Sequence, residues 1–140
     1  MQKLTCALLV DDDQTTNYLN QLLLKRLAVT EKLLIANNGQ EALDLLQQHC
    51  HTATPDCPVL ILLDVKMPIM NGFEFLEAYA QLPFAQGQTI VIVMLTTSLH
   101  PQDVQRLEHL NISDFVNKPL TEEKIDSILR KHFARQLPKA

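Results

Sequence analysis

Short apolar runs alternate along this chain with longer segments in which the apolar residues recur at helical spacing. The apolar runs lie at Lys3–Val10, Leu33–Ala36, Val59–Leu63, Ile90–Leu95 and Phe115–Asn117. Runs of this kind, with little polar alternation, are typical of strands buried on both faces. Helical spacing covers Gln14–Leu27, Gln40–His49, the residues after Gly72 to about Ala80, a segment opened by Pro101, and a last segment capped by Thr121. The pattern therefore predicts five strands, each followed by a helix.

The predicted helices carry apolar stripes that we expect to pack against the sheet. These stripes are Ala42, Leu43 and Leu46, then Phe73, Leu76 and Ala80, and finally Ile125, Ile128, Leu129 and Phe133, while Leu19, Leu22, Leu23 and Leu27 repeat at the same spacing in the first helix. Right-handed crossovers return the chain to the same edge of the sheet, so repeated strand and helix units build a parallel sheet covered on both faces. The predicted class is α/β, a doubly wound five-stranded parallel sheet with five helices.

The length and composition match one domain. The chain has 140 residues, of which 46% are hydrophobic and 20% are charged, which suffices for a proper core. We expect a single domain over residues 1–135 and a flexible tail over residues 136–140. Residues Cys50 to Pro58 carry two prolines and no periodicity, and they are predicted to form a loop away from the carboxyl ends of the strands.

The charge and hydropathy of the chain exclude several classes of partner. A net charge of −4 and a pI near 5.7 argue against direct nucleic-acid binding, which needs a basic face. The basic residues Lys124, Arg130, Lys131 and Arg135 are expected to favour the negative end of the last helix. No apolar run has the length of a membrane span, and the first residues turn acidic too soon for a signal peptide. The expectation is a cytoplasmic protein without membrane contact.

The three cysteines, Cys6, Cys50 and Cys57, are an odd number without the spacing of a disulfide framework, so reduced thiols are expected. Cys50 and Cys57 lie near His49 and His51, which raises the alternative of a metal site. No established zinc spacing is matched there, and adjacent residues rarely point to one centre. A structural or incidental use of these four residues is favoured over metal binding.

Polar side chains follow four of the predicted strands at the point where each strand ends. Asp11–Asp13 follow the first strand, Asp64 the third, Thr96 the fourth and Lys118 the fifth. Because the carboxyl ends of parallel strands meet at one edge, these groups are expected to share a site. Carboxylates suit Mg²⁺, an ammonium and a hydroxyl can balance phosphoryl charge, and one carboxylate could be a nucleophile. Asp13 is better explained as the cap of the helix that follows.

Several segments, in this order and spacing, carry a resemblance to a known family. They are Leu8-Leu9-Val10-Asp11-Asp12, Ala36 to Leu43, Ile61 to Gly72, Leu95-Thr96-Thr97 and Asn117-Lys118-Pro119. With them the chain resembles the receiver domains of bacterial two-component response regulators over nearly its whole length. The resemblance implies the flavodoxin-like strand order 2-1-3-4-5 and, for this chain, a stand-alone receiver.

The resemblance also implies a role for each residue at the strand ends. Asp64 would be the phosphoacceptor. Asp11 and Asp12 would be the acidic pair of a Mg²⁺ site, with Asp12 and Asp64 as side-chain ligands and Lys66 contributing its backbone carbonyl. Lys66 is also a candidate for setting the lifetime of the phosphate.

On the phosphoryl side, the resemblance implies that Thr96 and Lys118 bind the phosphoryl oxygens. Phe115 would be the aromatic switch residue whose rotamer follows Thr96, and from its own segment Phe115 is also predicted to be a core residue. A cis Lys118–Pro119 bond would aim the lysine at the site.

The implied function is a phosphorylation-dependent signalling switch. It would take a phosphoryl group from a sensor histidine kinase or a phosphotransfer protein, and lose it by hydrolysis, without being an enzyme in any further sense. The phosphoryl group would reshape the face made by the fourth helix, the fifth strand and the fifth helix, where a downstream protein binds. The sequence names neither the kinase nor the target.

Two alternatives stay open from the sequence. Val10 to Thr15 resembles the first motif of haloacid-dehalogenase-type phosphatases, in which Asp11 would be the nucleophile and Asp13 the general acid. The chain is short for that family, and the turn after Asp64 is then unexplained. A docking module with the fold but without a phosphoryl cycle is the third reading.

Overall fold

The computed structural model describes residues 3–50, 57–65, 67–82, 90–96 and 112–133. Five parallel strands form one sheet in the order β2-β1-β3-β4-β5, and they are β1 (Leu4–Val10), β2 (Thr30–Ala36), β3 (Leu60–Asp64), β4 (Val91–Thr96) and β5 (Asp114–Asn117). The helices are α1 (Gln14–Arg26), α2 (Gly39–His49), α3 (Gly72–Ala80) and α5 (Glu122–Phe133). The predicted class and strand order are confirmed. The helix expected from Pro101 lies outside the described residues.

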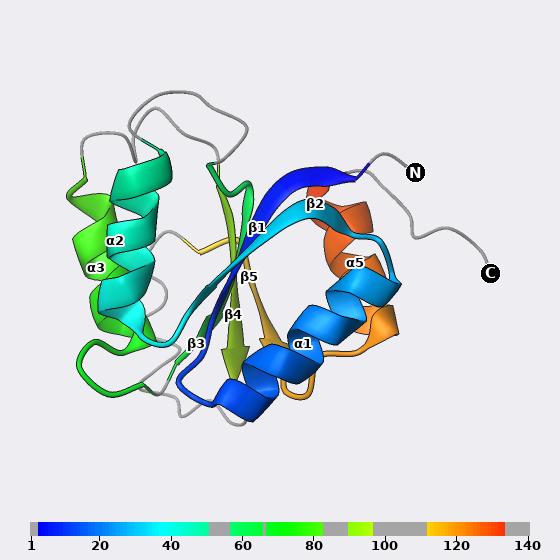
Figure 1. The fold of residues 1–140 in the computed structure, drawn as a ribbon, viewed down its shortest axis with the longest axis horizontal. Coiled ribbons are helices and arrows are strands. Elements are labelled where there is room, and N and C mark those ends of the chain that lie inside the picture. Colours follow the sequence, from blue (N-terminus) through cyan, green and yellow to red (C-terminus); the bar gives the residue numbers. More distant parts are fainter. Residues whose placement is uncertain (1–2, 51–56, 66, 83–89, 97–111, 134–140) are drawn as a thin grey trace.

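The sheet is covered on both faces. In Figure 1, α2 and α3 lie on one side of the sheet, and α1 and α5 lie on the other. Successive residues of β1 divide between the two sides, because Leu8 belongs to the core under α2 and α3 while Leu9 belongs to the core under α1 and α5. Burial on both faces removes the need for polar alternation, and this explains the continuous apolar runs of the sequence.

The predicted stripes are mostly correct. The three stripe residues of α2 and the first three of α5 are buried, as are Phe73 and Leu76 of α3. Ala80, the last residue of α3, is exposed. In α1 the buried leucine is Leu24, whereas Leu19 and Leu22 are exposed.

Strand β2 begins at Thr30, three residues before the predicted start at Leu33. The added residues include Glu31 and Lys32, which are exposed. Because β2 is an edge strand of the sheet, polar residues can pair in it without being buried. A prediction based on apolar runs alone therefore begins this strand too late.

Side chains cap the helices as the sequence suggests. Asp13 is the N-cap of α1: its Oδ1 accepts a hydrogen bond from the Thr15 amide at 3.2 Å, and its Oδ2 accepts one from the Thr16 hydroxyl at 2.6 Å. The Thr16 bond is the main reason that the pKa of Asp13 is lowered. Asn71 and Glu74 form a capping box at the start of α3. The assignment of Asp13 as a cap is confirmed.

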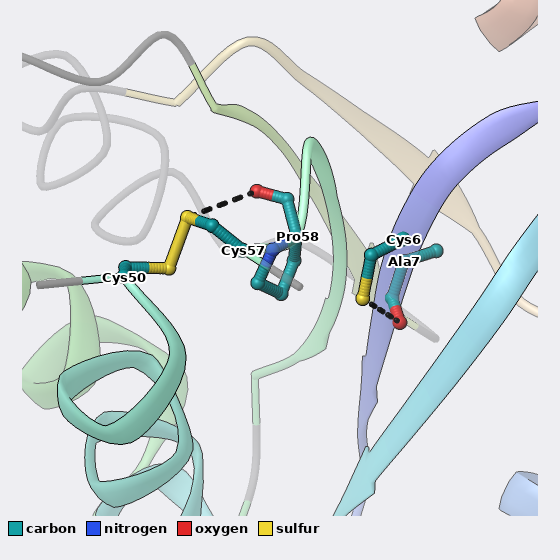
Figure 2. Close-up of a disulfide and its surroundings, with 5 residues drawn as sticks. All are labelled: Cys6, Ala7, Cys50, Cys57 and Pro58. Carbon is teal, nitrogen blue, oxygen red and sulfur yellow. Dashed lines mark hydrogen bonds between the residues drawn. A yellow bond between two sulfur atoms is a disulfide. The ribbon is translucent and has the colours of Figure 1, made fainter. Parts of the chain in front are cut away.

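The expectation of reduced thiols is wrong for two of the three cysteines. Cys50 ends α2 and Cys57 precedes β3 by two residues of loop, and their sulfurs form a disulfide with a Cα–Cα distance of 4.7 Å (Figure 2). Cys6 is a buried thiol on β1 that is not part of this disulfide. The crossover from α2 into β3 brings Cys50 and Cys57 together, and spacing in the sequence cannot reveal such a contact.

Reduction of the disulfide should destabilise the domain. Closing a loop with a sequence separation of 7 lowers the entropy of the unfolded chain, which corresponds to about 2–3 kcal/mol of stability. We expect urea unfolding of the wild type to shift to lower urea when a dithiol reductant is added. The double variant Cys50→Ala/Cys57→Ala should start at the lower stability and show no response to the reductant. An unchanged wild-type midpoint would contradict a stabilising bond.

Candidate functional site

The register of the sheet places the polar strand ends at one edge. Val10 of β1 lies opposite Leu63 of β3, and Asp64 lies opposite Leu95 of β4. The residues that follow Val10 and Leu63 are Asp11 and Asp64, so both carboxylates leave the sheet at the same level. Thr96 pairs with Asn117 in the same way, directly before Lys118.

Three carboxylates gather at this edge. One oxygen each from Asp11, Asp12 and Asp64 lies within 4.8 Å of the other two. Asp11 and Asp64 are buried, whereas Asp12 is exposed. Like charges at such distances repel one another strongly unless a cation lies between them. The cluster is therefore a candidate cation site made entirely of hard oxygen ligands.

Lys118, the residue that follows β5, joins the cluster. Its Nζ lies 2.8 Å from Oδ2 of Asp11 and 3.0 Å from Oδ1 of Asp64. The ammonium therefore bridges two buried carboxylates at the ends of the neighbouring strands β1 and β3. Such paired and hydrogen-bonded charges are the arrangement in which carboxylates can stay ionised away from water.

The main chain holds each of these residues in place. The Lys118 amide donates to the Thr96 carbonyl at 2.7 Å, and the Lys118–Pro119 bond is cis, as the family resemblance implied. Thr96 itself is buried at the end of β4. Asp64 Oδ1 accepts a hydrogen bond from the Val65 amide at 2.9 Å.

Gly72 allows the turn after Asp64 to lie against the end of β3. Its amide donates to the Val65 carbonyl at 2.9 Å, and a Cβ on Gly72 would lie 2.6 Å from the Asp64 carbonyl oxygen. A side chain does not fit at that distance, so glycine is required at this close approach. The turn that the haloacid-dehalogenase reading left unexplained thus serves to support Asp64.

Asn17 is a site residue that the sequence did not reveal. It is buried in α1, and its Nδ2 donates to the Asp11 carbonyl at 2.8 Å. The Asp13 amide donates to Asp11 Oδ1 at 3.0 Å. These bonds hold both the main chain and the carboxylate of Asp11. A polar residue on the sheet-facing side of a predicted helix is the signal that could have identified Asn17.

The charges of the site shift the pKa of two groups. Burial raises the pKa of Asp64, and the nearby charge of Asp11 acts in the same direction, while Lys118 opposes both. Burial acts to lower the pKa of Lys118, but its hydrogen bonds and charge contacts with Asp11 and Asp64 outweigh burial and the pKa is raised. Lys118 therefore carries its positive charge at neutral pH, and a further cation would favour the ionised form of Asp64.

One predicted site residue, Phe115, is more exposed than expected, and another, Lys66, is not described by the structure. Phe115 is 46% exposed on β5, so the prediction that it is a core residue is wrong. β5 is the last strand of the sheet, and exposed and half-buried residues alternate along it. Lys66 lies outside the described residues, and the roles given to its carbonyl and side chain stay predictions.

Comparison with known proteins identifies the family. The model of the response regulator receiver domain matches residues 7–130. The chain belongs to this receiver family. It is a phosphorylation-dependent signalling switch of two-component systems, as the family resemblance implied.

Relatives of this receiver occur in plants and bacteria. The chain is 35% identical over 129 residues to two-component response regulator 24 of Arabidopsis thaliana, covering 92% of this chain and 84% of that protein. It is 33% identical to the response regulator Rcp1 of Synechocystis, covering 79% of this chain and 74% of that protein. In a protein-glutamate methylesterase of Desulfotalea psychrophila, 34% identical, the match covers 81% of this chain and 29% of that longer protein.

Solved structures of receivers share the fold. A two-component response regulator from Cytophaga hutchinsonii superposes with a TM-score of 0.83 at 25% identity, covering 96% of this chain and all of that one. The chemotaxis protein CheY4 of Vibrio cholerae gives a TM-score of 0.72 at 27% identity, covering 90% and 96%. Nothing in these comparisons favours a haloacid-dehalogenase-type phosphatase.

Among the helices that the structure describes, none combines the length and apolar character that a membrane span needs.

Proposed function

We propose that Asp64 of this receiver is the phosphoacceptor, and that Asp11, Asp12 and Asp64 hold Mg²⁺ beside it. The observation that carries the proposal is the contact of one ammonium, that of Lys118, with the buried carboxylates of Asp11 and Asp64 inside a cluster of three acids. The donor set fits Mg²⁺, which prefers oxygen ligands and commonly combines one or two carboxylates with phosphate and water. When bound, Mg²⁺ would neutralise charge on the phosphoryl oxygens.

Asp64 is arranged to use one oxygen for attack. Both the Val65 amide and Lys118 Nζ contact Oδ1, so we assign the attack on phosphorus to Oδ2. The new bond joins Oδ2 to phosphorus, the bond from phosphorus to the donor's histidine nitrogen breaks, and the imidazole leaves with the electron pair. Lys118 stays within reach of the phosphoryl oxygens and balances their charge. Hydrolysis of the acyl phosphate returns Asp64 to its carboxylate.

The phosphoryl group would act as a switch through Thr96 and Phe115. Thr96 ends β4, and its carbonyl accepts the hydrogen bond of the Lys118 amide, so Thr96 and Lys118 respond together to a new anion. A hydroxyl drawn toward that anion leaves space behind it, which the exposed Phe115 can enter. The face that includes β5 and α5 would then change its affinity for a downstream protein. The free energy of this change cannot exceed the free energy by which the phosphate favours one conformer over the other.

The proposal is tested by offering a small phosphodonor in place of the kinase. Acetyl phosphate with Mg²⁺ should add one phosphoryl group to the intact mass of the protein, and chelation of the metal should prevent the addition. Addition that proceeds equally well without Mg²⁺ would contradict the metal site. No addition, and no spectroscopic response to beryllofluoride, would favour the docking module without a phosphoryl cycle.

The exposed face of α1 is where we place the phosphodonor protein. Tyr18, Leu19 and Leu22 are large apolar side chains exposed on this helix, with Leu19 at 58%. A cavity of about 430 Å³ continues from this face to the site, since Leu19 and Leu23 line it together with Lys118. A donor must bring its phosphohistidine to Asp64, so an apolar surface continuous with Lys118 suits a helical kinase or phosphotransfer partner.

A charged residue on this face should slow phosphorylation by a phosphotransfer protein but not phosphorylation by a small phosphodonor. For Leu19→Glu we expect phosphorylation by a phosphotransfer protein that modifies the wild type to fall by at least about tenfold, because a charge would be buried in an apolar contact. Phosphorylation by acetyl phosphate should stay within about twofold of wild type. Gln48→Glu, on the exposed side of α2, is the matched control and should change neither rate. Equal losses with both donors would place the effect of Leu19 in the site and not in docking.

A further inference from the structure

Lys124 binds the main chain on both sides of Lys118. It is the third residue of α5, and its Nζ donates to the Asn117 carbonyl at 2.7 Å and to the Pro119 carbonyl at 2.8 Å. The residue between these carbonyls is Lys118, whose own amide is bonded to the Thr96 carbonyl at 2.7 Å. The segment 117–119 is therefore held from β4 on one side and from α5 on the other.

Lys124 makes these contacts from a position in its helix that the helix dipole disfavours for a cation. The sequence predicted that Lys124 would favour the negative end of the last helix, but it lies in the first turn, where a cation is disfavoured by the helix dipole. The prediction is therefore wrong for Lys124, while Arg130 and Lys131 do lie in the last turn. Two charge-assisted hydrogen bonds to carbonyls can offset the unfavourable dipole interaction.

The carbonyls of Asn117 and Pro119 lie where the regular pairing of the sheet ends. Asn117 is the last residue of β5, and its register partner Thr96 is the last residue of β4. Beyond that point the segment needs partners other than a neighbouring strand. Among the described residues, Lys124 is the side chain that supplies a partner to both carbonyls.

We propose that Lys124 is a positioning residue for Lys118. By fixing the main chain before and after Lys118, Lys124 keeps the Lys118 ammonium at 2.8 Å from Asp11 and 3.0 Å from Asp64. The inference rests on the proposed function, in which Lys118 binds the phosphoryl oxygens. A displacement of a charged group by about 1 Å at such a site can reduce a rate by up to about 100-fold. Loss of Lys124 therefore weakens the phosphoryl site without removing any group that touches it.

The test uses three variants of the full chain. Lys124→Met keeps the side-chain stem and removes the ammonium, and Lys124→Arg restores a cationic donor at the same place. Lys131→Met is the control, because Lys131 also lies on α5 but pairs with Asp114, the first residue of β5, at 3.2 Å. The measurements are the affinity for beryllofluoride in Mg²⁺, the rate of phosphorylation by acetyl phosphate, the affinity for Mg²⁺ alone and the free energy of unfolding.

We expect Lys124→Met to weaken beryllofluoride binding and to slow phosphorylation by about tenfold. The affinity for Mg²⁺ alone should not fall, because the three carboxylates lie outside this segment and a displaced Lys118 ammonium competes less for two of them. Lys124→Arg should recover to within about threefold of wild type, and Lys131→Met should behave as wild type. A purely structural role would lower the free energy of unfolding in Lys124→Met and leave both phosphoryl readouts unchanged, and this result overturns the inference. Lys124→Gln, with a neutral donor, takes the place of Lys124→Met if the latter does not fold.

The failure of this inference is distinguishable from the failure of the proposed function. If wild-type protein binds beryllofluoride and Lys124→Met binds it equally well, Lys124 does not position Lys118. If the wild type binds no beryllofluoride, the phosphoryl site itself is absent, and the inference about Lys124 is overturned with it.

Discussion

Asp64→Asn is expected to abolish phosphorylation of this receiver while leaving its fold intact. The amide has nearly the shape of the carboxylate, and its Oδ1 can still accept the hydrogen bond of the Val65 amide. It lacks the charge that makes an oxygen nucleophilic, and removal of a nucleophile reduces a reaction by about 10⁴ to 10⁶. The intact mass after treatment with acetyl phosphate and Mg²⁺ should therefore equal that of the untreated variant.

Asp13→Asn is the matched control for this result. Asp13 is an exposed helix cap next to the cluster, and asparagine caps a helix about as well as aspartate. We expect this variant to be phosphorylated at the wild-type rate. In the phosphatase reading, Asp13 is the general acid and Asp64 has no catalytic role. A variant pattern in which Asp13→Asn is inactive and Asp64→Asn is active would therefore favour the phosphatase.

Lys118→Met is expected to lower the stability of the protein and to slow phosphotransfer, but to strengthen Mg²⁺ binding. Without the ammonium, the buried carboxylates of Asp11 and Asp64 face each other unpaired, and the metal-free protein should lose on the order of 3 kcal/mol. Phosphorylation should slow by about 10²–10³, the usual loss when one group that stabilises transition-state charge is removed. Mg²⁺ should bind more tightly than in the wild type, because the ammonium no longer competes for the two carboxylates.

Urea unfolding with and without Mg²⁺ checks the stability and metal effects together. Mg²⁺ should restore more stability to Lys118→Met than it adds to the wild type. Asp114→Asn, which weakens the surface contacts with Lys131 and His132, should change stability by less than about 1 kcal/mol and should not alter the response to Mg²⁺. If Lys118→Met binds Mg²⁺ no better than the wild type, the ammonium and the metal do not share these oxygens.

The sequence allowed the edge of the sheet that carries the site to be predicted. Each buried strand is an apolar run that stops at a polar residue, so the ends at Asp11, Asp64 and Thr96 could be located without coordinates. Parallel pairing then required these ends to lie at one edge. The strand order and the roles of single residues were not contained in the pattern, and they came from the resemblance to receivers.

Features that depend on contacts between segments separated in the sequence could not be predicted. The Cys50–Cys57 bond depends on how α2 returns to β3, and the contacts of Lys124 with Asn117 and Pro119 depend on the docking of α5. Helical spacing identified leucines in α1 but not which of them face the sheet, so Leu19 proved to be exposed. Apolar character alone also failed for Phe115, because its burial depends on what covers the last strand.

The assignment of Asp64 as the phosphoacceptor is tested most directly by finding which aspartate carries the phosphoryl group. After treatment with acetyl phosphate and Mg²⁺, borohydride reduction converts the acyl phosphate into a stable alcohol that peptide fragmentation can locate. We expect the modification at Asp64, in the peptide that contains the end of β3 and the turn to Gly72. Modification at Asp11 with Asp64 unmodified would contradict it.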